Sequence, residues 1–265
     1  MSVLAKEHAG SGVTVLTLDR PERRNALSLE LLAAIEDAFG QLATDPEVLS
    51  VVLTGSPPVF CAGFDLTEMS DPELLQSIRD ASSSYHRAVW SFPKPVVCAV
   101  NGPARAGGFD LTLLADLRFA STAASFGHPE IRFGAAPLFT PLRWIIGDGR
   151  ARDLCLTGRT IDAEEAESIG LVSRVVEPEA LLDEAVATAG SLGEIPAHVL
   201  ALTKGYMTTT GGRDFEASFV AEHDDAFDRT LAGLTPGEDL DEIAGRVAEH
   251  RDDVGAGNGA GQGGS

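Results

Sequence analysis

The sequence has few cysteines and no long hydrophobic run. Cys61, Cys98 and Cys155 are too few and too scattered for a zinc site or a disulfide framework, and they fit a reducing cytoplasm. No apolar run approaches the roughly 20 residues that cross a bilayer. The first residues also lack the apolar core of a signal peptide. These absences predict a cytoplasmic protein with no membrane partner.

Basic residues are scarce as well. The chain has 20 of them against 40 acidic residues, a net charge of −20, and only three of the basic residues are lysines. Such a negative chain is not expected to bind nucleic acid, whose phosphates need basic partners. The acidity is either an ordinary solvated surface or an adaptation to concentrated intracellular salt, where a Debye length of about 3 Å at 1 M screens repulsion. Scarce lysine fits a halophile, although a GC-rich genome also depletes lysine.

Several familiar chemical motifs are absent. The chain contains neither the G-x-x-x-x-G-K-[ST] loop for nucleotide phosphates nor the G-x-S-x-G nucleophile elbow. Its six histidines are dispersed without ligand spacing, so we expect no bound metal. His128 lies two residues before Glu130. We interpret it as a hydrogen-bonded structural histidine, with a place in a shared pocket as the alternative.

The hydrophobic pattern predicts an α/β protein with a large core. Apolar strands are expected at 13–18, 48–53, 96–100 and 117–120, separated by helices at 29–42 and 71–90. Ser28 is a good N-cap for the first of these helices. From residue 140 the pattern becomes mostly helical, with one further strand at 172–176 and helices over 162–168, 178–192, from 195, 214–231 and 238–250. We divide the chain into a core (1–192), a helical region (193–254) and a disordered glycine-rich tail (255–265).

The stretch Ala106-Gly-Gly-Phe-Asp110 joins the strand at 96–100 to a short helix. Glycines at a helix start let backbone N–H groups approach a ligand, and the helix dipole there favours negative charge. A plain, tightly packed turn is the alternative. Asp110 and Glu130, twenty residues apart, favour a site.

Several stretches, taken in order, resemble the crotonase (enoyl-CoA hydratase/isomerase) superfamily. They include Phe60-Cys-Ala-Gly-Phe-Asp-Leu66, Pro93-Lys-Pro-Val-Val-Cys-Ala-Val-Asn-Gly102, Ala106-Gly-Gly-Phe-Asp110 and Phe126-Gly-His-Pro-Glu130. The resemblance implies a spiral of β-β-α units, followed by a helical region that forms homo-trimers or dimers of trimers. It also implies an acyl-CoA thioester as ligand, with coenzyme A as part of the substrate and no separate cofactor.

The resemblance assigns roles to individual residues. Asp110 and Glu130 match the two carboxylates that hold a water molecule in family hydratases. The backbone N–H groups of Phe64 and Gly107 match the oxyanion hole that holds the thioester oxygen. Contacts to coenzyme A map to Arg24, Ala26, Ala62, Gly63 and Asp65.

The chain departs from the family hydratases at two positions. Asp110 replaces a glutamate, which draws the carboxylate back by about 1.5 Å, the length of a C–C bond. Leu138 stands where dienoyl-CoA isomerases carry a further aspartate. Three functions stay open: hydration of trans-2-enoyl-CoA as in fatty-acid β-oxidation, double-bond isomerisation of enoyl- or dienoyl-CoA, and non-catalytic acyl-CoA binding. The paired carboxylates argue against the last, because an unused buried acid costs stability.

Overall fold

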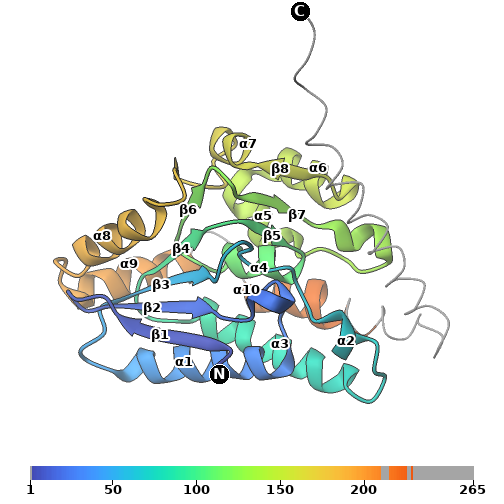
Figure 1. The fold of residues 1–265 in the computed structure, drawn as a ribbon, viewed down its shortest axis with the longest axis horizontal. Coiled ribbons are helices and arrows are strands. Elements are labelled where there is room, and N and C mark those ends of the chain that lie inside the picture. The colour runs from blue at the N-terminus through green and yellow to red at the C-terminus, as the bar shows by residue number, and fades with distance from the viewer. Residues whose placement is uncertain (1, 210–214, 226–227, 229–265) are drawn as a thin grey trace, which may run out of the picture.

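A six-stranded sheet forms the centre of the computed structural model, which describes residues 2–209, 215–225 and 228 (Figure 1). The strand order is β1-β2-β3-β4-β6-β9, and every neighbouring pair is parallel except β1 and β2. Strands β3 and β4 are buried along their whole length, as expected for parallel strands covered on both faces. The strands are β1 (Leu4–His8), β2 (Val13–Leu18), β3 (Ser50–Gly55), β4 (Val96–Val100), β6 (Leu117–Ser121) and β9 (Arg174–Val176).

A second sheet contains three short strands in the order β5-β7-β8. β5 follows β4 directly along the chain, and β7 follows β6, so each long strand leads into a short one and then into a helix. Isolated parallel bridges between Leu27 and Phe64 and between Cys61 and Ala104 repeat this step in earlier turns of the chain. The repetition is the spiral of β-β-α units. Its short strands are β5 (Pro103–Arg105), β7 (Ser125–Gly127) and β8 (Thr160–Asp162).

Some of the helices begin at a residue whose side chain caps them. Ser28 accepts a hydrogen bond from the Leu31 N–H at the start of α1, and Asp162 accepts one from the Glu165 N–H at the start of α7. The helical elements are η1 (Pro21–Arg23), α1 (Leu29–Thr44), α2 (Leu66–Met69), α3 (Leu75–Trp90), α4 (Gly107–Leu113), η2 (Pro129–Phe133), α5 (Phe139–Ile146), α6 (Asp148–Thr157), α7 (Ala163–Ser168), α8 (Leu181–Leu192), α9 (Ala197–Thr209), α10 (Phe215–Phe219) and the π-helical turn η3 (Val220–Asp224).

Helices cover the two faces of the large sheet. Alternating strand residues such as Val15, Val52 and Val97 face α8, whose Leu181 and Ala185 pack on them. The intervening residues face the larger core that contains α1 and α3. Figure 1 shows α1 and α3 side by side beneath the sheet, with α8 on its other side.

The long elements confirm the sequence predictions, whereas several short strands were not predicted. β2 and β4 have the predicted bounds, α1 runs two residues further than expected, and α3 begins at Leu75 rather than at residue 71. The expectation of a single strand beyond residue 140 was wrong, because β8 precedes β9. Only Ile161 of β8 is buried, so three residues with one inward side chain give no periodic signal.

The C-terminal predictions are only partly within the described residues. α10 and η3 lie inside the helix expected at 214–231. The helix expected at 238–250 and the glycine-rich tail at 255–265 lie outside the described residues, and the division at residue 192 stays a prediction. Among the described helices none is by itself long and apolar enough to cross a membrane; α8 and α9 together meet that length and composition but are bent by 109°.

Candidate active site

The start of α4 packs directly against the loop that follows β3. A Cβ added to Gly108 would lie 2.5 Å from the carbonyl oxygen of Cys61, closer than real Cβ contacts come, so glycine is required there. The Arg105 N–H donates to the same Cys61 oxygen at 3.0 Å. Two segments more than forty residues apart in sequence are therefore in backbone contact.

The same contact places Phe64 beside Gly107. A Cβ on Gly107 would lie 3.0 Å from the Phe64 ring, and Gly63, which has a φ of 95°, approaches the Gly107 nitrogen. The backbone groups of Gly63 and Asp65 pair with Leu27, so the peptide groups of Phe64 point to the other side of this strand-like segment. As the first residue of α4, Gly107 has an N–H with no partner inside the helix. The structure thus brings together the two residues assigned to the oxyanion hole.

Ala106, immediately before α4, has φ 48° and ψ −129°. Residues other than glycine rarely adopt this backbone conformation, which costs about 1–3 kcal/mol. This strained residue immediately precedes α4, so its backbone angles set the direction of the first turn of that helix.

Asp110 lies in the first turn of α4 and is buried. Burial raises its pKa to about 8; the charges of Glu130 and Glu222 add to this rise, and His128 opposes it. Burial therefore favours the protonated form of this carboxyl group.

Glu130 lies on η2, directly after β7, and faces Asp110 across a histidine. The His128 side chain is fully buried, with Nδ1 2.8 Å from Glu130 Oε1 and Nε2 3.8 Å from Asp110 Oδ1. Burial alone would lower the pKa of His128, but the charge and hydrogen bond of Glu130, with the charge of Asp110, raise it. The two carboxylates assigned to catalysis are thus connected by an imidazole.

Three polar atoms of this cluster are buried without a hydrogen-bond partner among the described residues. They are Asp110 Oδ1, His128 Nε2 and Glu130 Oε2. One ligand atom from each side chain lies within 4.8 Å of the others, a spacing that suits a bound water molecule and also a small cation. Since unpartnered buried polar atoms are costly, the cluster is built to receive a polar guest. The expectation of no metal stays a prediction.

The wall of the site comes from α5 and η3. Leu138, buried, precedes α5 and offers it no side-chain cap. Glu222 supplies that cap from η3: its Oε2 accepts the N–H groups of Phe139 at 3.1 Å and Thr140 at 2.7 Å. The C-terminal segment therefore holds the helix that begins beside the site.

The residues assigned to coenzyme A also lie together, on two hydrogen-bonded loops. Ala62 N–H donates to the Arg24 carbonyl at 3.1 Å, and Leu27 N–H donates to the Gly63 carbonyl at 2.8 Å. Ala26 is buried between them and Arg24 is exposed.

The Asp65 carboxylate does not face an open site. It accepts a hydrogen bond from Arg20 Nη2 at 3.0 Å and caps α2 through the Thr67 N–H. Burial opposes its charge, but the Arg20 guanidinium and the Thr67 N–H outweigh burial and lower the pKa of Asp65. Asp65 therefore joins the two loops through its side chain, and its main-chain groups are paired as well: its N–H donates to the Leu27 carbonyl and its carbonyl accepts the Met69 N–H.

The structure adds three residues to those named from the sequence. His128 was interpreted as a structural histidine; it is hydrogen-bonded as expected, and it also lies between the two carboxylates. Its position two residues from Glu130 was the available signal. Arg20 stood in a charged loop with nothing to indicate its partner, and Glu222 lies too far along the chain to be paired with α5 from sequence.

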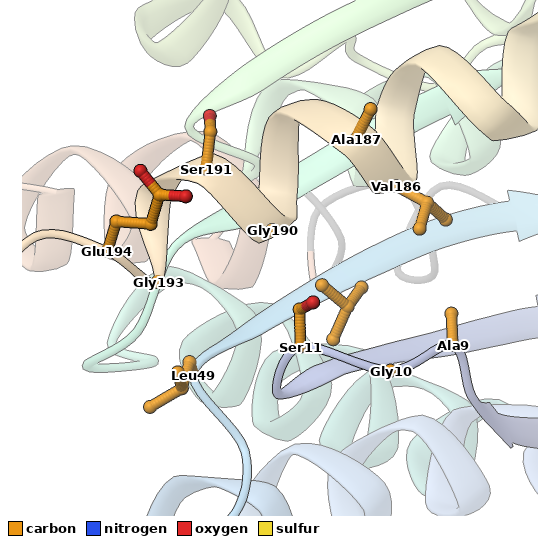
Figure 2. A pocket seen from close by; sticks show the side chains of 11 residues that line it. Ala9, Gly10, Ser11, Leu49, Val186, Ala187, Gly190, Ser191, Gly193 and Glu194 are labelled. Atoms are coloured by element: carbon orange, nitrogen blue, oxygen red, sulfur yellow. The ribbon is translucent and has the colours of Figure 1, made fainter.

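A surface hollow of about 510 Å³ lies elsewhere, between the β1–β2 turn and α8 (Figure 2). Glu194 is the one charged residue among those that line it, and it shares none of its lining residues with the carboxylate cluster. The paired acids and the polar atoms without partners favour α4, not this hollow, as the candidate site of chemistry.

A spiral of β-β-α units that brings a buried and a half-buried carboxylate to a glycine-lined helix start defines the crotonase class of proteins. A family model described as enoyl-CoA hydratase/isomerase matches residues 8–232. A probable enoyl-CoA hydratase of Mycobacterium bovis is 38% identical over 213 residues, 78% of this chain and 80% of that protein. The short-chain-enoyl-CoA hydratase of Clostridium acetobutylicum is 37% identical over 186 residues, 68% of this chain and 71% of that protein.

A crystal structure of an enoyl-CoA hydratase/isomerase from Pseudoalteromonas atlantica aligns with a TM-score of 0.82 at 29% identity. The alignment covers 94% of this chain and 97% of that one. The chain belongs to the enoyl-CoA hydratase/isomerase family.

Proposed function

We propose that this protein hydrates trans-2-enoyl-CoA thioesters to 3-hydroxyacyl-CoA. The observation that carries the proposal is the pair of carboxylates, buried Asp110 and half-buried Glu130: each has an oxygen with no partner among the described residues, and each offers a ligand atom within 4.8 Å of the other. A water molecule held there has an acid and a base beside it. The names of the relatives support the same reaction.

The reaction needs one proton donor and one proton acceptor at the same time. Burial raises the pKa of Asp110, which favours its protonated form and makes it the candidate proton donor, with Glu130 as the candidate acceptor. One member takes a proton from water as the oxygen bonds to Cβ, and the other delivers a proton to Cα. Across the addition the pair regains the proton that it gives, so no further reactant is needed.

Negative charge develops on the thioester oxygen as water adds. We assign its stabilisation to the backbone N–H groups of Phe64 and Gly107, which lie on adjoining segments held by the Gly108 contact. Donors fixed in advance stabilise an enolate more than the uncharged thioester, and this difference lowers the barrier.

Coenzyme A would lie along the two joined loops, with contacts from Arg24, Ala26, Ala62, Gly63 and Asp65. Because the Asp65 carboxylate is paired with Arg20 and its main-chain groups with Leu27 and Met69, its contribution would be to hold the two loops in place. Coenzyme A arrives as part of the substrate, and no separate cofactor is needed. We further propose that the chain works as a homo-trimer or a dimer of trimers.

Double-bond isomerisation is the alternative, favoured by the short Asp110 side chain; the buried Leu138, in the place of the further aspartate of dienoyl-CoA isomerases, speaks against that one kind of isomerase. An isomerase needs one base to move a proton along the acyl chain, so Glu130 would act alone. Its product keeps a double bond and gains no oxygen.

Substitution of the two carboxylates tests these functions. Crotonyl-CoA reports hydration and a 3-enoyl-CoA reports isomerisation; on whichever of them the wild-type protein turns over, Glu130→Gln should reduce kcat by about 10²-fold or more, because the amide cannot titrate. Asp110→Asn should be nearly as damaging in a hydratase and should leave most activity in an isomerase. Asp110→Glu, which restores the missing methylene, should raise hydration if the short arm limits it. Wild-type turnover in Glu130→Gln would contradict both functions.

A further inference from the structure

His128 is the one member of the buried cluster that the proposed hydration does not use. Its side chain has no solvent exposure, and its two ring nitrogens face different acids. Nδ1 is hydrogen-bonded to Glu130, whereas Nε2 has no partner among the described residues and points toward the Asp110 oxygen that also lacks one. A histidine that only filled space in the core would not leave a buried ring nitrogen without a hydrogen-bond partner between two carboxyl groups.

The fold holds this imidazole firmly. The ring of Phe109, from α4, lies 4.6 Å from the His128 ring, and the backbone on either side is fixed. The carbonyl of Gly127 accepts the Ala106 N–H at 3.1 Å, and a Cβ on Gly158 would come within 3.0 Å of the His128 carbonyl. The ring therefore has little freedom to leave the acids.

We propose that His128 is a positioning residue for the hydration: through Nδ1 it fixes the Glu130 carboxylate so that Glu130 Oε2, Asp110 Oδ1 and His128 Nε2 surround one water molecule. This inference rests on the proposed function. With Oε1 held by the histidine, the second oxygen of Glu130 is directed at the water. The bare Nε2 contributes a third polar contact to the same water.

The arrangement also offsets the shortened acid. A water molecule seated between two long carboxylates needs no third partner, but Asp110 reaches about 1.5 Å less far than a glutamate would. His128 Nε2, 3.8 Å from Asp110 Oδ1, offers the water molecule a contact on the side of the shortened acid. We expect this contact to matter less than the hydrogen bond from Nδ1, whose loss would misplace Glu130; a positional error near 1 Å costs on the order of 10²-fold in rate.

Charged and titratable groups surround the trio from several elements. Glu130 and Asp110 face His128 directly and raise its pKa. The charge of Glu222, on η3, helps to raise the pKa of Asp110, and the charge of Asp110 helps to raise the pKa of Tyr85, on α3. The charges of Asp110, Glu130 and Glu222 help to raise the pKa of Cys155, on α6. Removal of the Glu130 charge should therefore lower the pKa of His128.

The test uses a matched pair of variants. In His128→Asn the side-chain amide nitrogen lies near the Nδ1 position and can still donate a hydrogen bond to Glu130. Leucine has nearly the same shape as asparagine but no donor, so His128→Leu loses this hydrogen bond. We expect kcat for crotonyl-CoA hydration to fall about 10²-fold in His128→Leu and less than about 10-fold in His128→Asn, with KM changed less than about threefold in both. A His128→Leu variant with wild-type kcat, or a His128→Asn variant equally impaired, would overturn the proposal.

A second measurement does not depend on activity or on a His128 variant. The His128 imidazole is titrated by NMR in the wild-type protein and in Glu130→Gln. A lower pKa in Glu130→Gln is expected, and an unchanged pKa would refute the coupling. If the wild-type protein hydrates no enoyl-CoA, the proposed function fails, while this titration still shows whether His128 is coupled to Glu130.

Discussion

Substitution of Gly108 by alanine should separate the two segments to which we assign the oxyanion hole. The new Cβ would lie 2.5 Å from the Cys61 carbonyl oxygen and 2.7 Å from Cys61 Cβ, whereas ordinary contact begins at 3.4 Å. The loop must therefore move by about 0.9 Å, the difference between the carbonyl distance and ordinary contact. Because the Cys61 carbonyl also accepts the Arg105 N–H, the movement weakens the bridge between the loop and β5.

The magnitude follows from this displacement. Phe64 is three residues after Cys61, so a shift near 1 Å there should reduce kcat by about 10²-fold. Overpacking of this kind costs about 1–3 kcal/mol of the free energy of unfolding. Gly107→Ala should have a smaller effect than Gly108→Ala. Its Cβ would lie 3.0 Å from the edge of the Phe64 ring, and a side chain moves aside more readily than backbone.

Steady-state hydration of crotonyl-CoA and urea unfolding measure the two effects. Gly149→Ala, in α6, is the matched control because nothing lies within 4 Å of its added Cβ. That variant should keep full activity and change stability by less than about 1 kcal/mol. If Gly108→Ala behaves like Gly149→Ala, the two segments do not fix each other and the reasoning is wrong.

Three further predictions concern stability and assembly. Ala106→Gly should stabilise the protein by about 1 kcal/mol in urea unfolding, because relief of strain exceeds the entropic cost of glycine; a loss of stability would show that no strain is stored there. His86 is fully buried, and burial lowers the pKa of His86 and of His223, so both are neutral in the folded protein. Their contribution to stability is present above the unfolded pKa of about 6.5 and is lost as the pH falls below it; the thermal midpoint should drop between pH 7.5 and 5.5, and less so in His86→Gln. Light scattering across a KCl series should find trimers or hexamers in molar salt and dissociation as salt is removed, and a stable, active trimer at millimolar salt would rule out the halophile interpretation.

The sequence predicted the elements that carry a regular pattern. α1 has six buried residues along one stripe and a serine cap, and β4 is an unbroken apolar run, so each is recognisable by itself. β5, β7 and β8 have three residues each, too few for a period to show. They become strands because longer strands bring them into register, which is information from the whole fold.

The candidate site was predicted by resemblance more than by pattern. Asp110 and Glu130 could be named because ordered motifs flank them, but the part played by His128 could not, since a lone histidine in sequence is compatible with many environments. The pairing of Arg20 with Asp65 spans 45 residues, and no local rule connects them. Contacts of this kind depend on loops that only the folded spiral brings together.

The cap that Glu222 places on α5 has a consequence during synthesis on the ribosome. The strands of the large sheet follow one another in nearly the order in which they are made, so each can join its neighbour as it emerges. Glu130 is translated 92 residues before Glu222, a delay of roughly 5 to 20 seconds at about 5–20 residues per second. Throughout that interval the nascent chain contains Asp110 and Glu130, but the N–H groups at the start of α5 do not yet have Glu222 as their hydrogen-bond acceptor. The candidate active site is therefore completed by the C-terminal segment, after the strands of the large sheet have been made.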